Sequence, residues 1–275
     1  MHVLRNVRST VLKLHVVHHN SQRDNQFVES KVQSYMAGLF FILFSYLFIG
    51  DMMKILCFLI IGLLLITFVK LDNNTTNNKH VSLFGINIVI DPGHGGKDNG
   101  TCYENVLEDE INLSIATKLM NICIEDGAIS SLTRVDDYDL ASQYAKNRKR
   151  EDLKKRVEFI NCSGADYFVS LHLNSYPSNK NVYGPMVYYK RNDDISKNMA
   201  MSVMKNLNEL AKTSKPIHPE NFYLFKHTNA PGILVECGFL SNYKERELLL
   251  DDKYQEKIAK TIYKGLDDYI IGNKV

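Results

Sequence analysis

The sequence predicts an α/β domain with a mostly parallel sheet of roughly six strands flanked by helices. Short apolar runs rich in Val, Ile and Phe alternate with longer stretches of helical periodicity from Val81 onward. Three of the apolar runs end on a His or a Glu, whereas a strand buried in a parallel sheet is normally hydrophobic throughout. The composition, with 45% hydrophobic and 23% charged residues, is that of an ordinary globular protein.

The individual elements follow from the spacing of the apolar side chains. Apolar runs bounded by turn residues predict strands at residues 86–90, 129–133, 167–172, 184–189, 222–225 and 232–236. Apolar positions that recur every three or four residues predict helices at 108–124, 152–162, 195–211, 243–249 and 253–270. In this layout, functional residues are expected at the carboxyl ends of the strands.

The N-terminal third differs from this pattern. Residues 1–51 are expected to be a basic and apolar extension, and the run ILCFLIIGLLLITFV between Lys54 and Lys70 predicts a membrane anchor at 52–70. The alternative is a buried core helix. Because MKILCFLIIGLLLITFVK is a complete anchor, we hypothesise that translation of the natural protein begins at Met52 or Met53. The Asn-rich residues 71–80 are expected to be a linker and 81–275 the catalytic domain.

Charge and cysteine content exclude several classes of protein. A net charge of +2, with no basic stripe interleaved with aromatic residues, excludes nucleic acid as the expected partner. The five cysteines form no CxxC pair, which argues against a structural zinc knuckle and against a disulfide-dense scaffold. One bridge stays open among four of them, namely Cys102, Cys123, Cys162 and Cys237.

Polar residues at the predicted strand ends point to metal chemistry. The stretch VIDPGHGGKDNG places His94 between glycines, which allow unusual backbone angles and leave room for a bound group. VSLHLNS contains His172, ILVECGFLSN contains Glu236, and Glu108 opens a predicted helix. Two imidazoles, one carboxylate and an open position make a catalytic zinc site, and a second carboxylate can then transfer protons.

Structural explanations compete with this interpretation. His172 alone is more often a hydrogen-bonded core residue than a ligand, and acids such as Glu108 suit a helix N-terminus through the helix dipole. Glu236 is harder to explain in this way, because an ionised buried carboxylate without a partner is very costly. DPGHGG lacks the spacing of the glycine-rich phosphate-binding motifs. Together the signals favour a metal site.

The stretches IVIDPGHGGKDNG, LEDEINLSIATKL, VSLHLNS and PGILVECGFLSN together resemble the zinc-dependent N-acetylmuramoyl-L-alanine amidases of the amidase_3 family. The resemblance covers residues 81–268. It implies one Zn²⁺ ion bound by His94, Glu108 and His172, with Glu236 as the catalytic residue. Glu108 is preferred to Glu110 because it fits the family register E-x-x-x-x-L-x-I-A.

The resemblance also suggests roles for two further residues. Asn174, just past His172, is a candidate substrate contact or a strand-ending turn residue, and Arg156 is interpreted as structural. At residues 216–219 the chain reads PIHP where many relatives carry an Arg, which leaves the contacts on the substrate side open. No long insertion separates Glu108 from His172, so we expect either open access to the site or control by a separate activating protein.

The resemblance implies hydrolysis of the amide between N-acetylmuramic acid and L-alanine in peptidoglycan. A single anchored domain without wall-binding repeats resembles the germination-specific amidases of the spore cortex, and general wall remodelling is the alternative. The positive residues before the anchor and the wall substrate place the catalytic domain on the extracytoplasmic side of the cell membrane. A zinc peptidase acting within the stem peptide and a non-catalytic peptidoglycan-binding module are the competing functions.

Overall fold

The structure is a computed structural model that describes residues 59–61 and 82–272. The predicted extension, anchor and linker lie outside these residues, apart from the helical residues 59–61. In the part of the chain that is described, none of the helices combines the length and the apolar character needed to cross a bilayer. The chain divides after Asn78, and the unit Lys79–Val275 contains every element named below.

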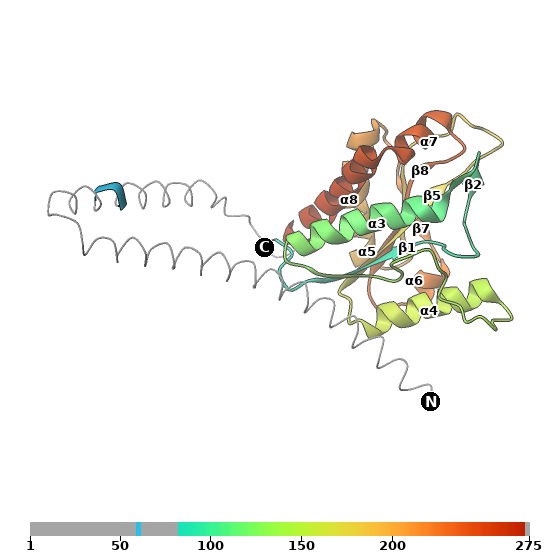
Figure 1. Cartoon of the computed structure of the whole chain (residues 1–275), viewed down its shortest axis with the longest axis horizontal. Coiled ribbons are helices and arrows are strands. Elements are labelled where there is room, and N and C mark those ends of the chain that lie inside the picture. Colours follow the sequence, from blue (N-terminus) through green and yellow to red (C-terminus); the bar gives the residue numbers. More distant parts are fainter. Residues whose placement is uncertain (1–58, 62–81, 273–275) are drawn as a thin grey trace, which may run out of the picture. The chain divides into compact units, whose positions relative to one another are not determined.

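A six-stranded sheet forms the centre of this domain, in the order β4-β1-β5-β8-β6-β7 (Figure 1). Its strands are β1 (Asn87–Pro92), β4 (Ile129–Leu132), β5 (Tyr167–Asn174), β6 (Met186–Lys190), β7 (Ile217–Glu220) and β8 (Gly232–Phe239). Neighbouring strands are parallel except for β6 and β8, which are antiparallel. The predicted α/β class with a mostly parallel sheet is therefore confirmed.

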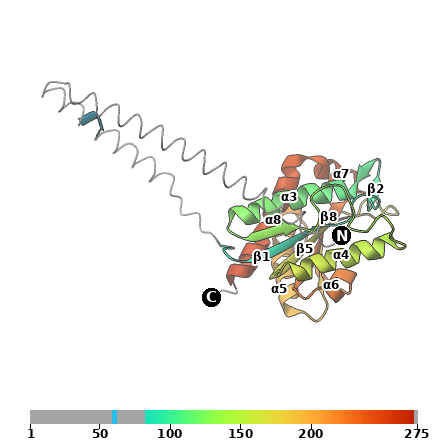
Figure 2. The same ribbon diagram turned by 60° about the horizontal axis from the view of Figure 1, so that its bottom comes forward.

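Helices cover both faces of the sheet (Figures 1 and 2). One face packs against α3 (Glu108–Glu125), α5 (Asp194–Ala211) and α8 (Asp252–Gly272), and the other against α4 (Arg148–Cys162) and α6 (Tyr223–His227). The pleat of β1 divides its side chains between the two layers: Ile88 and Ile90 enter the first core and Val89 the second. A small hairpin, β2 (Cys102–Tyr103) and β3 (Val106–Leu107), leads directly into α3, and α7 (Tyr243–Leu250) follows β8.

The predicted strand at 222–225 is wrong, because these residues begin the short helix α6. Leu224 and Phe225 are adjacent in sequence and both enter the core under α4. A strand would send such neighbours to opposite faces, whereas one turn of helix can bury both. The sixth strand is instead β7, which pairs with β6 at the edge of the sheet. An edge position tolerates Pro219, which has no N–H to donate.

Candidate catalytic metal centre

The loop after β1 holds His94 in a left-handed backbone conformation, with φ at +62°. The glycines around it have a specific reason. A Cβ on Gly93 would overlap the ring of His172, and a Cβ on Gly100 would lie 2.5 Å from Glu108 Oε2 and 2.7 Å from the His94 ring. The bare backbone therefore makes room for the two neighbouring side chains of the site as well as for any bound group, which refines the interpretation drawn from the sequence.

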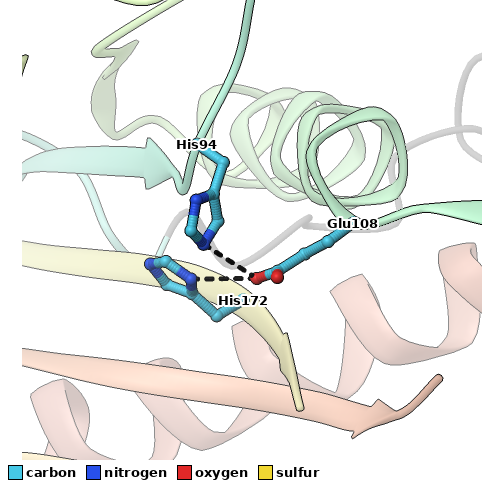
Figure 3. A group of neighbouring side chains, drawn as sticks. All are labelled: His94, Glu108 and His172. Atoms are coloured by element: carbon cyan, nitrogen blue, oxygen red, sulfur yellow. Dashed lines mark hydrogen bonds and ion pairs between the residues drawn. The ribbon is translucent and has the colours of Figure 1, made fainter. Parts of the chain in front are cut away.

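Three side chains from separate elements converge at this loop (Figure 3). His94 follows β1, Glu108 is the first residue of α3, and His172 lies in β5. Glu108 Oε1 is 3.3 Å from His94 Nε2 and 3.0 Å from His172 Nδ1. One ligand atom from each residue falls within 4.8 Å of the others, so the three residues that the sequence predicted as metal ligands form a cluster that can hold a metal ion.

Glu108 is only 2% exposed, and hydrogen bonds hold both oxygens of its carboxylate in place. Its Oε2 accepts a hydrogen bond from the N–H of Thr101 at 2.7 Å, and its Oε1 accepts one from the N–H of Leu173 at 3.0 Å. Burial opposes ionisation, but the hydrogen bonds and charges of His172 and His94 outweigh it and hold the pKa of Glu108 well below its usual range. The carboxylate is therefore ionised and aimed at both imidazoles.

Asp98 orients His94 from the opposite side of its ring. The Nδ1 atom of His94 lies 3.1 Å from Asp98 Oδ2, which leaves Nε2 directed at Glu108. Burial lowers the pKa of His94, but the hydrogen bonds and charges of Glu108 and Asp98 raise it by a larger amount. The net shift of the His94 pKa is therefore upward. A metal-binding histidine commonly donates its second ring N–H to a carboxylate in this way.

Glu236 lies on β8 directly opposite His172 of β5 in the sheet register. Its Oε2 atom is buried and has no hydrogen-bond partner among the described residues. Burial is the main cause that raises the pKa of Glu236 to about 7, with the charge of Glu108 adding to it. Glu236, His94 and His172 line a cavity of about 270 Å³ together with apolar side chains that include Phe222 and Leu234. A carboxyl group with a pKa near neutrality, beside a cluster that can hold a metal ion, is suited to proton transfer.

Comparison with known proteins agrees with this geometry. The family model of N-acetylmuramoyl-L-alanine amidases, Amidase_3, matches residues 88–268. The chain belongs to the Amidase_3 family. This amidase is 38% identical over 204 residues to the germination-specific N-acetylmuramoyl-L-alanine amidase of Bacillus subtilis, which covers 72% of this chain and 85% of the relative.

Solved structures give the same assignment. The CwlD amidase from Clostridioides difficile, determined in complex with the GerS lipoprotein, superposes with a TM-score of 0.65 at 38% identity over 67% of this chain and 98% of that one. An N-acetylmuramoyl-L-alanine amidase from Clostridium difficile 630 gives a TM-score of 0.60 at 33% identity over 67% and 96%. The protein is therefore an amidase that hydrolyses the bond between N-acetylmuramic acid and L-alanine in peptidoglycan.

Two buried arginines hold the loop of this amidase from behind. Arg156 of α4 donates to the carbonyls of Pro92 and His94 and forms ion pairs with Asp91 and Asp152, both at 2.8 Å. This contact set agrees with the structural role expected for Arg156. Arg134, just past β4, donates to the carbonyls of Pro92 at 3.1 Å and of the following glycine at 3.0 Å. Arg134 was not among the residues predicted from the sequence, although a polar residue directly after a predicted strand is the same kind of signal that identified His94.

Asn174 lies at the end of β5, two residues past His172. Its Oδ1 atom accepts a hydrogen bond from the N–H of Ser175 at 2.8 Å, and its amide nitrogen faces the sulfur of Met186 at 3.6 Å. Its predicted contact with substrate stays a prediction. The cysteine bridge left open by the sequence does not form among the described residues, where Cys102, Cys123, Cys162 and Cys237 are all free.

Proposed function

We propose that this amidase acts with one zinc ion bound by His94, Glu108 and His172. The donor set is two imidazole nitrogens and one carboxylate oxygen, which is a known set for catalytic zinc. Ligands about 2.0–2.1 Å from a tetrahedral zinc ion lie about 3.4 Å from one another. The separations of 3.3 Å and 3.0 Å from Glu108 Oε1 to the two imidazoles are close to that spacing. The contact of Asp98 with the second nitrogen of His94 supports the same assignment.

Glu236 is the proton-transfer residue in this proposal. When bound, zinc supplies Lewis-acid polarisation of the amide carbonyl and a lowered pKa for water. The Glu236 carboxylate accepts a proton from the attacking water and delivers it to the departing amine of L-alanine. Its buried oxygen without a hydrogen-bond partner, in a cavity shared with both histidines, is the observation that carries this role. A single group can serve both steps because its pKa of about 7 lies near the working pH.

The test combines metal content with turnover. Purified protein is expected to contain about one zinc ion per chain, and to release L-alanyl peptide from muramyl peptide in a reaction that chelator abolishes. Glu236→Gln is expected to keep the zinc and to lose about 10²–10⁴-fold in kcat. Glu110→Gln, an exposed neighbour of the Glu108 ligand, is the matched control and should leave both unchanged. A new amino terminus within the stem peptide would instead identify a peptidase, and unchanged turnover in Glu236→Gln would remove its catalytic role.

We further propose that the substrate is spore-cortex peptidoglycan. The 38% identity to a germination-specific amidase across 85% of that protein's length supports this choice over general wall remodelling. Deletion of the gene in a spore-forming host is expected to remove muramic-δ-lactam from the cortex. Unchanged lactam, with normal amidase activity of the purified protein, would move the function to vegetative wall remodelling.

We also propose that the amidase works at the cell membrane with a protein partner. The apolar run at 52–70 supports single-pass anchoring with the catalytic domain outside the cytoplasm. The CwlD amidase was solved in complex with a lipoprotein, and this supports a partner of that kind here. Membrane fractionation of the chain with and without residues 52–70, followed by identification of co-purifying lipoproteins, tests both points. A chain that stays soluble with these residues present would contradict the anchor.

A further inference from the structure

Glu236 lies between His172 of β5 and Met186 of β6 in the sheet. In the sheet register His172 pairs with Glu236, and Glu236 pairs with Met186 on its other side. Paired residues share a face of the sheet, so these three side chains stand in line across β5, β8 and β6. Tyr188, two residues further along β6, projects from the same face. The catalytic carboxyl group therefore has the histidine on one side and a methionine on the other.

Two hydrogen-bond donors converge on the sulfur of Met186. The Asn174 amide nitrogen lies 3.6 Å from Met186 Sδ and the Tyr188 hydroxyl lies 3.7 Å from it. A thioether is a weak acceptor, whereas an amide and a phenol are strong donors. Within the described part of the chain these two donor groups have no other acceptor. The donors are therefore held in place without a partner that matches their strength.

Each donor is oriented by a separate contact. Asn174 Oδ1 accepts from the N–H of Ser175 at 2.8 Å, and because that partner requires an oxygen, the amide nitrogen must be the atom that faces the sulfur. The ring of Tyr188 packs against Phe222 and His218, with centroid distances of 5.3 Å and 5.6 Å. Packing of the ring fixes where the hydroxyl points. Burial and the nearby Glu236 raise the pKa of Tyr188, so the hydroxyl keeps its proton.

We propose that the Asn174 amide and the Tyr188 hydroxyl form a two-donor subsite beside Glu236 that binds a carbonyl or carboxylate oxygen of the substrate. The substrate oxygen takes the hydrogen bonds that the Met186 sulfur accepts only weakly in its absence. The half-buried positions of Asn174, Met186 and Tyr188 leave the subsite accessible. This inference rests on the proposed function, because it places the substrate beside the cluster of His94, His172 and Glu236.

The test compares steady-state kinetics of Tyr188→Phe and Asn174→Ser on a muramyl peptide. Serine keeps a short acceptor for the Ser175 N–H but cannot reach the sulfur. Each substitution removes one neutral hydrogen bond, and KM is expected to rise about three- to tenfold, with a smaller change in kcat. The double variant is expected to lose less than the product of the two single losses, because both donors contact one oxygen. Tyr189→Phe, on the opposite face of β6, is the matched control and should leave KM unchanged.

Met186→Leu separates substrate binding from a bracing role. If the two donors serve only to hold the methionine in place, Met186→Leu reproduces the defect of the double variant and the subsite is overturned. If they bind substrate, Met186→Leu removes only the competing acceptor, and KM does not rise. Zinc content and thermal midpoint are measured for every variant, and should Asn174→Ser fail to fold, Tyr188→Phe alone carries the test. An inactive wild type would refute the proposed function, whereas an active wild type with unaffected variants would refute only the subsite.

Two truncated substrates identify the source of the oxygen. One lacks the N-acetyl carbonyl of the muramic acid, and the other carries L-alanine amide in place of the stem peptide. The KM effect of Tyr188→Phe is expected to vanish with the one substrate that lacks the contacted oxygen. An effect that persists undiminished with both substrates would assign the contact to the lactyl or alanyl carbonyl, which both substrates retain.

Discussion

Replacement of Arg156 by methionine is expected to destabilise the domain and to release the loop that holds His94. Arg156 is only 1% exposed. It contacts Asp152 and Asp91, each at 2.8 Å, together with the carbonyls of Pro92 and His94. Methionine retains much of the apolar stem but removes every one of these interactions. The partners stay buried, and a buried polar group that loses its partner is strongly destabilising.

The expected loss is about 3 kcal/mol. Removal of one member of a buried ion pair costs about 3–5 kcal/mol. Thr133 and Ser170 still donate to Asp91, at 2.6 Å and 2.7 Å, which places the loss at the lower end of this range. Zinc affinity is expected to fall as well, because the carbonyl of His94 loses its donor.

The loss is also expected to depend on pH. Burial raises the pKa of Asp91, but Arg156, Thr133 and Ser170 together bring it below the ordinary value of 3.8. The stabilisation is therefore present above that value and is lost as the pH falls through the lower pKa of the folded protein. In Arg156→Met the effect of burial is no longer opposed by the arginine, so ionisation of Asp91 destabilises the folded variant. The difference in stability between wild type and variant should widen as the pH rises above 3.8.

Urea unfolding followed by circular dichroism at several pH values measures this difference. The matched control is Lys155→Met on the same helix, where the lysine forms an exposed ion pair with Glu158 at 2.8 Å. That change should cost less than about 0.5 kcal/mol. A loss below about 1 kcal/mol for Arg156→Met near neutral pH, or a difference that narrows as the pH rises, would refute the reasoning.

Three further outcomes test the metal centre. Asp98→Ala is expected to weaken zinc binding about 10–100-fold in a chelator competition, while Lys97→Ala should not; equal effects would exclude an orienting role for Asp98. Gly100→Ala adds a methyl group 2.5 Å from Glu108 Oε2 at a φ of +67°, so zinc content should fall sharply in a protein that still folds, and full occupancy would contradict this. In metal-free protein, burial raises the Glu236 pKa from 4.5 to about 7, so wild type should lose up to about 3 kcal/mol of stability as the pH rises through that window. Glu236→Gln should abolish this loss in thermal unfolding at pH values on either side of the window, and a variant with the wild-type pH profile would count against it.

Local pattern predicted the elements that position the site. The apolar runs of β1, β5 and β8 lead into polar residues. The parallel pairing of these strands brings His94, His172 and Glu236 together at the carboxyl ends of the strands. The start of α3 at Glu108 was also predicted, and this places its carboxylate between the two imidazoles. The cluster itself could therefore be anticipated, because two of its members follow or end apolar strands and the family register selects Glu108 from the neighbouring acids. Its role as a zinc site stays a prediction.

The contacts that orient these residues could not be predicted in the same way. Arg134 lies at least 41 positions along the chain from the loop carbonyls that it contacts, and Arg156 lies at least 62 positions away. Nothing in the local sequence indicates which carbonyls they contact. The overlap that a Cβ on Gly93 would have with His172 is likewise a property of two adjacent strands. The error at 222–225 arose because a short apolar run fits a strand and one turn of helix equally well, and burial by α4 decided between them.

Three of the four site residues lie in or just after consecutive strands in the middle of the sheet: His94 after β1, His172 in β5 and Glu236 in β8. A ligand bound there stabilises the folded state and therefore opposes every opening that separates these strands. Amide hydrogen exchange in the central strands should slow when metal is added, because exposure of their N–H groups would require the bound ion to leave. The edge strands β4 and β7 can open without disturbing that cluster, so their exchange should change far less. A map of exchange rates with and without metal would thus outline the metal centre from the backbone alone.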